Sequence, residues 1–262
     1  MTSKMIESKF ETIIGLEIHA QLKTQSKIFS ADRTDFGGAD NDHVSYVSAG
    51  FPGTLPVLNA EVVELGIKAG LALNCHINSK SIFARKNYFY PDLPKGYQIS
   101  QYEKPLCENG YIEFIHNNQR KKVNIVRAHL EEDAGKSMHQ GGSTLLNYNR
   151  AGVPLLEIVS APEIRSGSEA AEYANQIRTI LRYIDACDGN LEEGSLRCDC
   201  NVSVRPLGET QLGTKVEIKN INSFSFIEKA IEYESERQID AILNGEKILQ
   251  ETRLYDSDKN RT

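Results

Sequence analysis

The sequence contains no Cys-x-x-Cys pair, although five cysteines occur among its 262 residues. These are Cys75, Cys107, Cys187, Cys198 and Cys200. Because they are odd in number and scattered, they indicate neither a disulfide framework nor a structural zinc site, and they favour a reducing compartment. Cys198 and Cys200 fall on the apolar side of a strand pattern, so we interpret them as small core residues rather than as ligands.

The sequence also lacks an excess of positive charge and a long apolar N-terminal run. Its formal net charge is −6 at pH 7, which argues against a protein that coats nucleic acid through bulk electrostatics. Contact with nucleic acid would therefore require a local basic groove. The N-terminus shows no apolar run and no cleavage pattern of small residues, so we expect a cytoplasmic protein without a targeting peptide or a membrane span.

The distribution of apolar residues predicts the fold class. Apolar residues make up 40% of the sequence and charged residues 25%, which is ordinary for a globular protein. Strand patterns occur at residues 14–22, 123–133, 153–160, 195–205 and 215–219, and helical patterns at 60–73, 169–186 and 226–243. Asn59 is the expected N-cap of the first helix, and Ser166 begins a capping box at the second. The irregular order of one-sided strands predicts an α+β protein with a largely antiparallel sheet and packed helices.

Residues 129–137, HLEEDAGKS, combine two features of phosphate chemistry. The ending Gly135-Lys136-Ser137 is typical of a P-loop, but that motif requires a glycine where Leu130 stands, so a P-loop is excluded. The strand alternation places Val126, Ala128 and Leu130 on one face, and Arg127, His129, Glu131 and Asp133 on the other. The acids are then either a solvated edge, as most acidic runs are, or carboxylates among polar partners on a sheet face.

Two further strand patterns carry candidate ligands. Glu17 and His19 lie two residues apart, so their side chains project from the same face about 7 Å apart. They could share one ion, or they could belong to an exposed polar face. Glu157 interrupts an apolar run, and an unpaired buried carboxylate would cost several kcal/mol, so its partner is either an arginine or a metal ion.

Asp199 lies between Arg197 and Asn201 on the polar face of residues 195–205. This mixture of charges suits a metal-bound phosphate whose oxygens the arginine also neutralises. Several carboxylates on one-sided strands predict a concave acidic face that holds Mg²⁺ for nucleotide chemistry. His19 is a less usual Mg²⁺ ligand, so it could instead orient a ligand or move a proton.

Residues 82–105 contain three prolines and predict an ordered loop with short strands. Within it, the stretch ARKNYFYPDLPKGYQISQY places five aromatic residues close to Arg85, Lys86 and Lys95. Aromatic faces with interleaved cations can stack a base, at about 1–3 kcal/mol per base, and can hold phosphates. Packing of a proline-rich loop is the alternative interpretation.

Long strings between about Phe10 and Asp258 carry a family resemblance. They read IGLEIHAQL, FPGTLPVLN, RKNYFYPDLPKGYQISQ, HLEEDAGKS, NRAGVPLLEIVS, EEGSLRCDCNVSVRP and EIKNINSF. In these strings the chain resembles the B subunits of the aspartyl/glutamyl-tRNA amidotransferases, the bacterial and organellar enzymes that make Gln-tRNA(Gln) and Asn-tRNA(Asn) indirectly. The resemblance implies that residues 1–262 form a catalytic cradle domain of the glutamine synthetase and guanidino kinase type. Family members continue past this length with the rest of the cradle, a helical domain and a tail domain that contacts tRNA, so we expect an incomplete cradle.

The resemblance also implies a function. The family is a carbon–nitrogen ligase with glutamine as amido donor: ATP phosphorylates the side-chain carboxylate of glutamate or aspartate on a misacylated tRNA, and ammonia then displaces the phosphate. A separate amidase subunit releases the ammonia, and a small third subunit clamps the two together. If the source is eukaryotic, the location would be an organellar matrix. The alternative is a non-catalytic RNA-binding or scaffold protein of such a complex.

The resemblance assigns site residues by position. It implies that Glu17, His19, Glu131, Glu157 and Asp199 line the metal and phosphorylation site. Among these, Glu17, His19 and Glu131 are the catalytic candidates, and Glu132 is the weakest addition. From charge and motif context, Lys86, Arg197 and Lys219 are candidate phosphate contacts for ATP. The expected cofactors are ATP and Mg²⁺.

Overall fold

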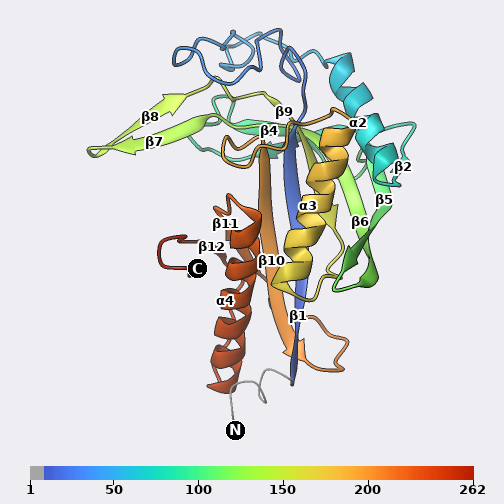
Figure 1. The fold of residues 1–262 in the computed structure, drawn as a ribbon. Helices are drawn as coiled ribbons and strands as arrows, with labels where there is room; N and C mark the ends of the chain where they lie inside the picture. The colour runs from blue at the N-terminus through green and yellow to red at the C-terminus, as the bar shows by residue number, and fades with distance from the viewer. Residues whose placement is uncertain (1–8) are drawn as a thin grey trace.

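The computed structural model describes residues 9–262, in which one large mixed sheet is accompanied by two small sheets and three helices (Figure 1). The helices are α2 (Ala60–Ala72), α3 (Gly167–Tyr183) and α4 (Phe224–Leu243). The large sheet contains β1 (Phe10–Gln21), β2 (His76–Ile77), β5 (Cys107–His116), β6 (Gln119–Glu132), β9 (Pro154–Ser160), β10 (Leu196–Pro206), β11 (Val216–Lys219) and β12 (Thr252–Leu254). The small sheets are β3 (Phe83–Asn87) with β4 (Tyr97–Gln101), and β7 (Lys136–Gln140) with β8 (Ser143–Asn147).

The strand order of the large sheet is β12-β11-β10-β1-β9-β6-β5-β2. Every neighbouring pair is antiparallel except β11 and β12, which are parallel. The predicted α+β class with a largely antiparallel sheet is therefore confirmed. The parallel edge pair was not predicted, because nothing in the local pattern of residues 252–254 fixes the direction in which they pair.

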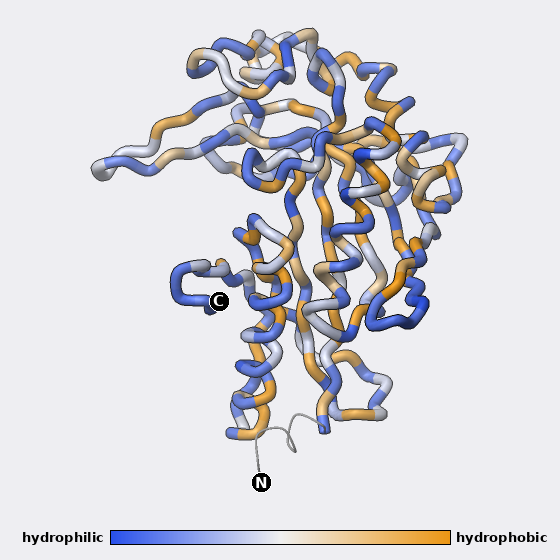
Figure 2. The backbone as a smooth tube through the Cα atoms, in the orientation of Figure 1, coloured by the Kyte–Doolittle hydropathy of each residue, from blue (hydrophilic) through white to orange (hydrophobic). Residues whose placement is uncertain are grey.

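The helices cover one face of the sheet and leave the other face open. Helix α4 packs on β10, α3 packs on β1 and β5, and α3 and α4 pack on each other. Beneath them, every second residue of β1 is buried, namely Ile14, Leu16, Ile18 and Ala20. Figure 2 shows hydrophobic segments along the central strands and on these helices. Because the core occupies one face, the intervening polar residues of the same strands lie on the opposite face.

The predicted element bounds agree with the structure to within four residues. Asn59 caps α2 by accepting a hydrogen bond from the Glu61 backbone N–H at 2.9 Å, and Ser166 caps α3 by accepting from Glu169 at 3.2 Å. The loop over residues 82–105 contains the short strands β3 and β4, as predicted. Strands β2, β5, β7, β8 and β12 were not predicted. The Gly-Lys-Ser segment enters the β7–β8 hairpin, which projects from the body of the protein (Figure 1).

One prediction about β6 was wrong. Val126 was expected on the apolar face with Ala128 and Leu130, but its side chain is 47% exposed. The register of β6 against β9 shifts between Ile125 and Arg127, so an extra residue interrupts the alternation there. Ile125, only 1% exposed, takes the core position instead, and from Arg127 onward the predicted faces are correct.

The five cysteines are all buried and free of disulfide bonds. Cys198 and Cys200 lie on the core side of β10, as the alternation predicted. Within residues 9–262, no helix combines the length and the apolar character that crossing a membrane requires.

Helix α2 approaches the sheet closely because two of its residues lack a side chain. A Cβ added at Gly66 would lie 2.7 Å from Leu106 Cδ2. At Gly70 it would overlap Cys107 Sγ and lie 2.7 Å from Ile77 Cδ1. These glycines allow α2 to lie directly on β5 and β6, so the helix supports the strand that carries Arg127, His129 and Glu131.

We expect Gly70→Ala to lower the free energy of unfolding by about 1–2 kcal/mol. Helix propensity alone would favour alanine by about 1 kcal/mol, but overpacking a tight core position typically costs about 1–3 kcal/mol. Urea unfolding would measure the difference. In the Cys107→Ala background the same substitution should cost less, because the overlapping sulfur is gone. Equal costs in both backgrounds would contradict this account of the helix–sheet contact.

Candidate functional site

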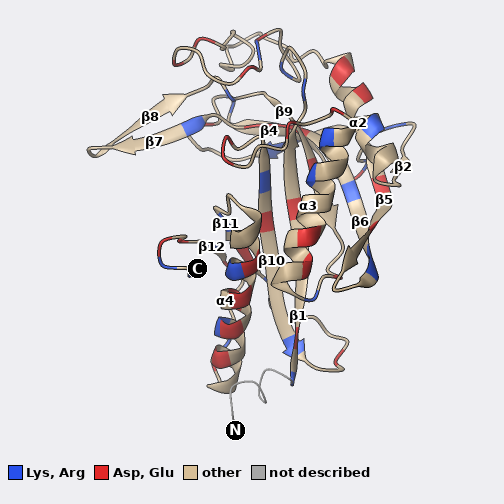
Figure 3. Cartoon of the chain, viewed as in Figure 1, with Lys and Arg blue, Asp and Glu red and all other residues tan. Residues whose placement is uncertain are grey.

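The register of four central strands arranges polar side chains in rows across the open face of the sheet. One row runs across β6, β9, β1 and β10 through His129, Glu157, His19 and Arg197. The next row runs across the same strands through Arg127, Val159, Glu17 and Asp199. Strand neighbours are about 4.8 Å apart and same-face residues about 7 Å apart. Figure 3 shows acidic and basic residues side by side on these strands.

A cleft of about 1030 Å³ lies over this face. The β3–β4 hairpin contributes one wall, with Lys86, Tyr88 and Ser100 among its lining residues. All eight of the principal site residues named from the sequence line this one cleft: Glu17, His19, Lys86, Glu131, Glu157, Arg197, Asp199 and Lys219. The structure thus gathers side chains from strands that are far apart in the sequence.

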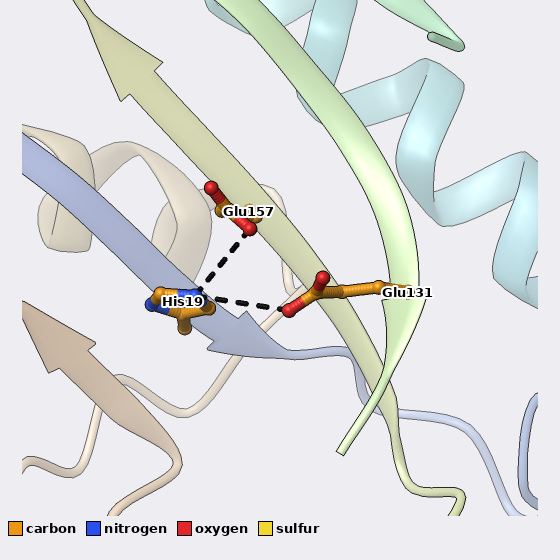
Figure 4. Close-up of side chains that lie close together, drawn as sticks. All are labelled: His19, Glu131 and Glu157. Atoms are coloured by element: carbon orange, nitrogen blue, oxygen red, sulfur yellow. Dashed lines mark ion pairs between the residues drawn. The ribbon is translucent and has the colours of Figure 1, made fainter. Parts of the chain in front are cut away.

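Three of these residues converge most closely (Figure 4). His19 Nε2 lies 3.5 Å from Glu157 Oε2 and 3.7 Å from Glu131 Oε1. Ligand atoms of His19, Glu131 and Glu157 all lie within 4.8 Å of one another. An imidazole nitrogen and two carboxylates at this separation can hold a divalent cation, whose charge would offset that of the carboxylates. We call His19, Glu131 and Glu157 the acidic cluster.

The two other predicted metal ligands lie outside the acidic cluster. Asp199 accepts a hydrogen bond from Lys219 Nζ at 2.6 Å, and Glu17 accepts one from Asn201 Nδ2 at 2.9 Å. Both carboxylates face the same cleft, but each has a protein partner. The five-residue set named from the sequence is therefore divided into a converging group of three and a flanking pair.

Glu132 does not face the cleft. Strand alternation turns it away from Glu131, and its carboxylate contacts Lys95 Nζ at 2.5 Å and accepts from the Ile99 backbone N–H at 2.8 Å. Burial raises the pKa of the Glu132 carboxyl, and the charge of Lys95 only partly offsets this effect. Glu132 lines a separate small cavity that also includes Lys27.

His129 was not named as a site residue from the sequence, although the alternation had already placed it on the polar face. Its Nε2 lies 3.3 Å from Glu157 Oε2 and 3.8 Å from Glu131 Oε2. Burial alone would lower the pKa of His129, but the hydrogen bonds and charges of Glu131 and Glu157 outweigh it and raise the pKa to about 9.

The same balance affects His19 and Glu157 in the acidic cluster. Burial works to lower the pKa of His19, yet the hydrogen bond and charge of Glu157, joined by the charge of Glu131, leave it above the ordinary value. Burial would raise the pKa of Glu157, but His129 and His19 hold it far below the usual range. Glu157 therefore has histidines as its protein partners, and no arginine lies within 4.0 Å of it in the described part of the chain.

Asp133 is a second residue that was not named as a site residue from the sequence. It is buried, and its carboxylate oxygens accept two hydrogen bonds from Arg197, both at 3.0 Å, while Arg150 lies 3.6 Å away. Burial would raise the pKa of Asp133, but the charges of Arg197 and Arg150 and the hydrogen bond from Gln21 leave it below the ordinary value. The pair joins the end of β6 to β10.

The three candidate phosphate contacts differ in their pairing. Arg197 is paired with Asp133, and Lys219 is paired with Asp199 and with Glu217, the latter at 3.1 Å. Within residues 9–262, no carboxylate lies within 4.0 Å of Lys86 Nζ, which instead stands 6.0 Å from the ring centre of Tyr88. Lys86 is thus the member of the three whose charge is available to a bound anion.

Comparison with known proteins gives a consistent result. The family model of the GatB/GatE catalytic domain matches residues 12–262. The chain is 68% identical over 253 residues to the B subunit of the aspartyl/glutamyl-tRNA(Asn/Gln) amidotransferase of Bdellovibrio bacteriovorus, covering 97% of this chain and 53% of that protein. It is 62% identical over 255 residues to the B subunit of the Thermodesulfovibrio yellowstonii enzyme, covering 97% and 54%. The chain spans about half the length of the curated relatives it matches.

We expect Asp133→Asn to lower the free energy of unfolding at pH 7 by about 2–3 kcal/mol, because it leaves the guanidinium of Arg197 without its anion in a partly buried site. The folded pKa of Asp133 lies below its ordinary 3.8, so the pair stabilises fully above pH 3.8 and the stabilisation is lost as pH falls through the folded pKa. Urea unfolding at pH 7 and at pH 3 should show a smaller difference at the lower pH.

Asp35→Asn is the matched control for this substitution. Asp35 pairs with Arg33 at 3.2 Å, but the side chains are 59% and 62% exposed, so the loss should be below about 1 kcal/mol. Equal losses for the two variants would contradict the structural role assigned to the pair between β6 and β10.

Proposed function

Because the chain belongs to the GatB/GatE catalytic domain family, we propose that it forms the phosphorylating and amidating site of a tRNA-dependent amidotransferase. The substrate would be glutamate or aspartate esterified to a non-cognate tRNA, and the product would be Gln-tRNA(Gln) or Asn-tRNA(Asn). The names of the relatives support this substrate class. The observation that carries the proposal is the convergence of His19, Glu131 and Glu157 within one large cleft.

The proposal extends to the fold. An antiparallel sheet that is covered by helices on one face and carries charged side chains on the other is consistent with a cradle of the glutamine synthetase and guanidino kinase type. In such an arrangement the core strands hold the reacting groups on a rigid surface, and the β3–β4 hairpin limits access of solvent from one side. Residues 9–262 would supply the floor and one wall of the cradle.

The first reaction step proposed is phosphoryl transfer. An oxygen of the substrate carboxylate attacks the γ-phosphorus of ATP, the bond to the bridging oxygen breaks, and ADP leaves. Such transfers depend mainly on positioning and on neutralisation of charge. His19, Glu131 and Glu157 would hold the Mg²⁺ ion. The two carboxylates are usual ligands of Mg²⁺, and the imidazole is a less usual one. When bound, the ion would neutralise part of the negative charge of the phosphates.

The surrounding residues position this chemistry. Ser100 Oγ donates a hydrogen bond to Glu131 Oε2 at 3.2 Å, which fixes the carboxylate from the hairpin side. Lys86 would contact the phosphates directly. Arg197 and Lys219 line the same cleft, but their existing ion pairs favour a role in which they hold Asp133 and Asp199 in place and add positive potential.

The second proposed step is amidation. The nitrogen of ammonia attacks the carbonyl carbon of the acyl phosphate, inorganic phosphate leaves, and the nitrogen loses a proton. Glu17 is the candidate to accept this proton, because it faces the cleft outside the acidic cluster and its side chain is hydrogen-bonded to the neutral amide of Asn201 rather than to a cation. A partner amidase subunit would supply the ammonia, with a small third subunit joining the two.

A non-catalytic scaffold is the competing hypothesis. The acidic cluster argues against it, since Glu131 and Glu157, buried beside His129 and next to His19, carry a desolvation cost that contact with a partner surface does not require. A metal-dependent catalytic role gives these residues a reason to be together.

We expect the chain to bind Mn²⁺, used as a paramagnetic probe for Mg²⁺, and Glu157→Gln to weaken that binding at least tenfold. The variant removes one of the two anionic donors of the acidic cluster. Electron paramagnetic resonance titration would measure free Mn²⁺. Glu192→Gln, at an exposed position away from the cleft, should bind as the unaltered chain does. Unchanged affinity in Glu157→Gln would contradict the metal site.

We expect Glu131→Gln to reduce amide formation by about 100-fold or more, the usual effect of removing one group that stabilises developing charge. The assay would use the chain within its full-length subunit and complex, with Glu-tRNA(Gln), ATP and added ammonium, so that the amidase step is bypassed. Glu113→Gln on β5, which is exposed and outside the cleft, is the matched control. Amide formation at the unaltered rate in Glu131→Gln would show that the assigned role is wrong.

A further inference from the structure

The β3–β4 hairpin has one face on the cleft and the other on the body of the protein. Lys86 and Ser100 lie on the cleft side and line the cleft. On the other side the ring of Phe83 packs edge-on against that of Phe29, with the ring centres 5.5 Å apart. The two strands are therefore fixed by the core, whereas the loop that joins them, residues 88–96, depends on contacts of its own.

Two hydrogen bonds tie this loop to the segments that flank the β7–β8 hairpin. The Gly135 backbone N–H donates to the Asp92 backbone carbonyl at 2.8 Å, and the Tyr148 hydroxyl donates to the Pro91 backbone carbonyl at 2.8 Å. We call Pro91, Asp92, Gly135 and Tyr148 the latch. Because Gly135 immediately precedes β7 and Tyr148 immediately follows β8, the latch joins the loop of one hairpin to the base of the other.

Gly135 makes this close approach possible. A Cβ added at Gly135 would lie 2.9 Å from Tyr148 Cδ1 and 3.0 Å from the backbone oxygens of Asp92 and Asn147. A side chain at this position would therefore push the tyrosine ring or the loop away, since packed atoms leave no room for it. The Gly-Lys-Ser segment, which is excluded as a P-loop, thus has a structural reason for its glycine.

Arg150 holds the same segment through its backbone. Its guanidinium donates hydrogen bonds to the Ala134 carbonyl at 2.9 Å and to the Gly135 carbonyl at 2.7 Å. Asp92, Ala134 and Arg150 all line the cleft. The latch therefore lies directly behind the rim of the cleft, at the end of β6 that carries Glu131.

A gap at this rim would have a chemical consequence. The acyl phosphate formed in the first proposed step can react with water as well as with ammonia. The oxygen of water then attacks the carbonyl carbon, the bond from that carbon to the phosphate oxygen breaks, inorganic phosphate leaves, and the carboxylate is regenerated with release of a proton. ATP would be consumed without formation of an amide. Enclosing a reactive intermediate prevents this kind of side reaction.

We propose that the latch closes the rim of the cleft at the end of β6, so that water is excluded from the acyl phosphate and ammonia is the nucleophile that reacts. Gly135 and Tyr148 are positioning residues, because neither lines the cleft and both act through the loop of residues 88–96. This inference rests on the proposed function, which supplies the acyl phosphate, and it assigns the selectivity of that site for ammonia over water.

The test measures how many ATP molecules are consumed for each amide formed by the full-length subunit in its complex, with Glu-tRNA(Gln), ATP and added ammonium. Tyr148→Phe removes only the hydroxyl of the latch. It should raise this ratio from about one to about two or more, because a rim held by one hydrogen bond fewer admits water to the intermediate. Gly135→Ala should also raise the ratio. The double variant should show little more than the larger single effect, because both changes break the same contact.

Tyr255→Phe is the matched control. The Tyr255 hydroxyl also donates a hydrogen bond, to Asn260 Oδ1 at 3.0 Å, but Tyr255 does not line the cleft. Its ratio of ATP to amide should equal that of the unaltered subunit. An equal rise in Tyr255→Phe and Tyr148→Phe would indicate a general loss of stability and would overturn the latch. An unchanged ratio in both Tyr148→Phe and Gly135→Ala would overturn the latch while leaving the proposed function intact.

Hydrogen–deuterium exchange of the 262-residue chain measures the latch without catalysis. Tyr148→Phe should speed exchange in residues 88–96 and 133–137 by about two- to tenfold, the range that loss of one hydrogen bond allows, and should leave exchange in α3 unchanged. Exchange at the unaltered rate in residues 88–96 would overturn the latch. If the unaltered complex formed no amide, the proposed function and the protection of its intermediate would be overturned, whereas faster exchange would still support the latch as the contact that closes the rim.

Discussion

The antiparallel register of β6, β9, β1 and β10 is the constraint on which the candidate site depends. Each strand contributes alternate residues to the open face, and the register decides which of them become neighbours. A shift of one residue in any strand would turn its charged side chains into the core and its apolar ones into the cleft. The burial of Ile18 beneath helices and the exposure of His19 to the cleft are therefore two results of the same pairing.

The charges of the cleft differ in how they are neutralised. Asp133 has Arg197 on β10 as its basic partner and Asp199 has Lys219 on β11, so these ion pairs need no ligand to complete them. The acidic cluster has only histidines as its basic partners within residues 9–262, and Lys86 and Arg127, which line the same cleft, have no carboxylate within 4.0 Å there. These two unbalanced regions face one cleft, and a metal ion with a phosphate-bearing ligand would balance both. The unpaired charges of the cleft thus match the charges of the proposed metal ion and phosphate-bearing ligand.

The sequence predicted those parts of the fold that depend on local periodicity. Strict alternation identified β1 and β10 with their correct faces, and capping residues located the starts of α2 and α3. Strand β5 escaped prediction because Glu108 and Gly110 weaken its alternation. Ion pairs between residues that are distant in the sequence could not be predicted either. Arg197 and Asp133 are 64 residues apart, and only the fold shows that each neutralises the other. The same limit hid the place of His129 between two carboxylates, although its face was correct.

The bulge at Val126 separates two stretches of β6 in which different alternate residues face the core. Before the bulge, where β6 pairs with β5, the odd-numbered residues Val123 and Ile125 lie in the core. After the bulge, the odd-numbered residues Arg127 and Glu131 face the cleft instead. Without the extra residue one half of β6 would be turned over, and that half would place its apolar residues on the cleft side and its polar residues in the core. The bulge therefore keeps the apolar residues of both halves, Val123, Ile125, Ala128 and Leu130, on one face of the sheet.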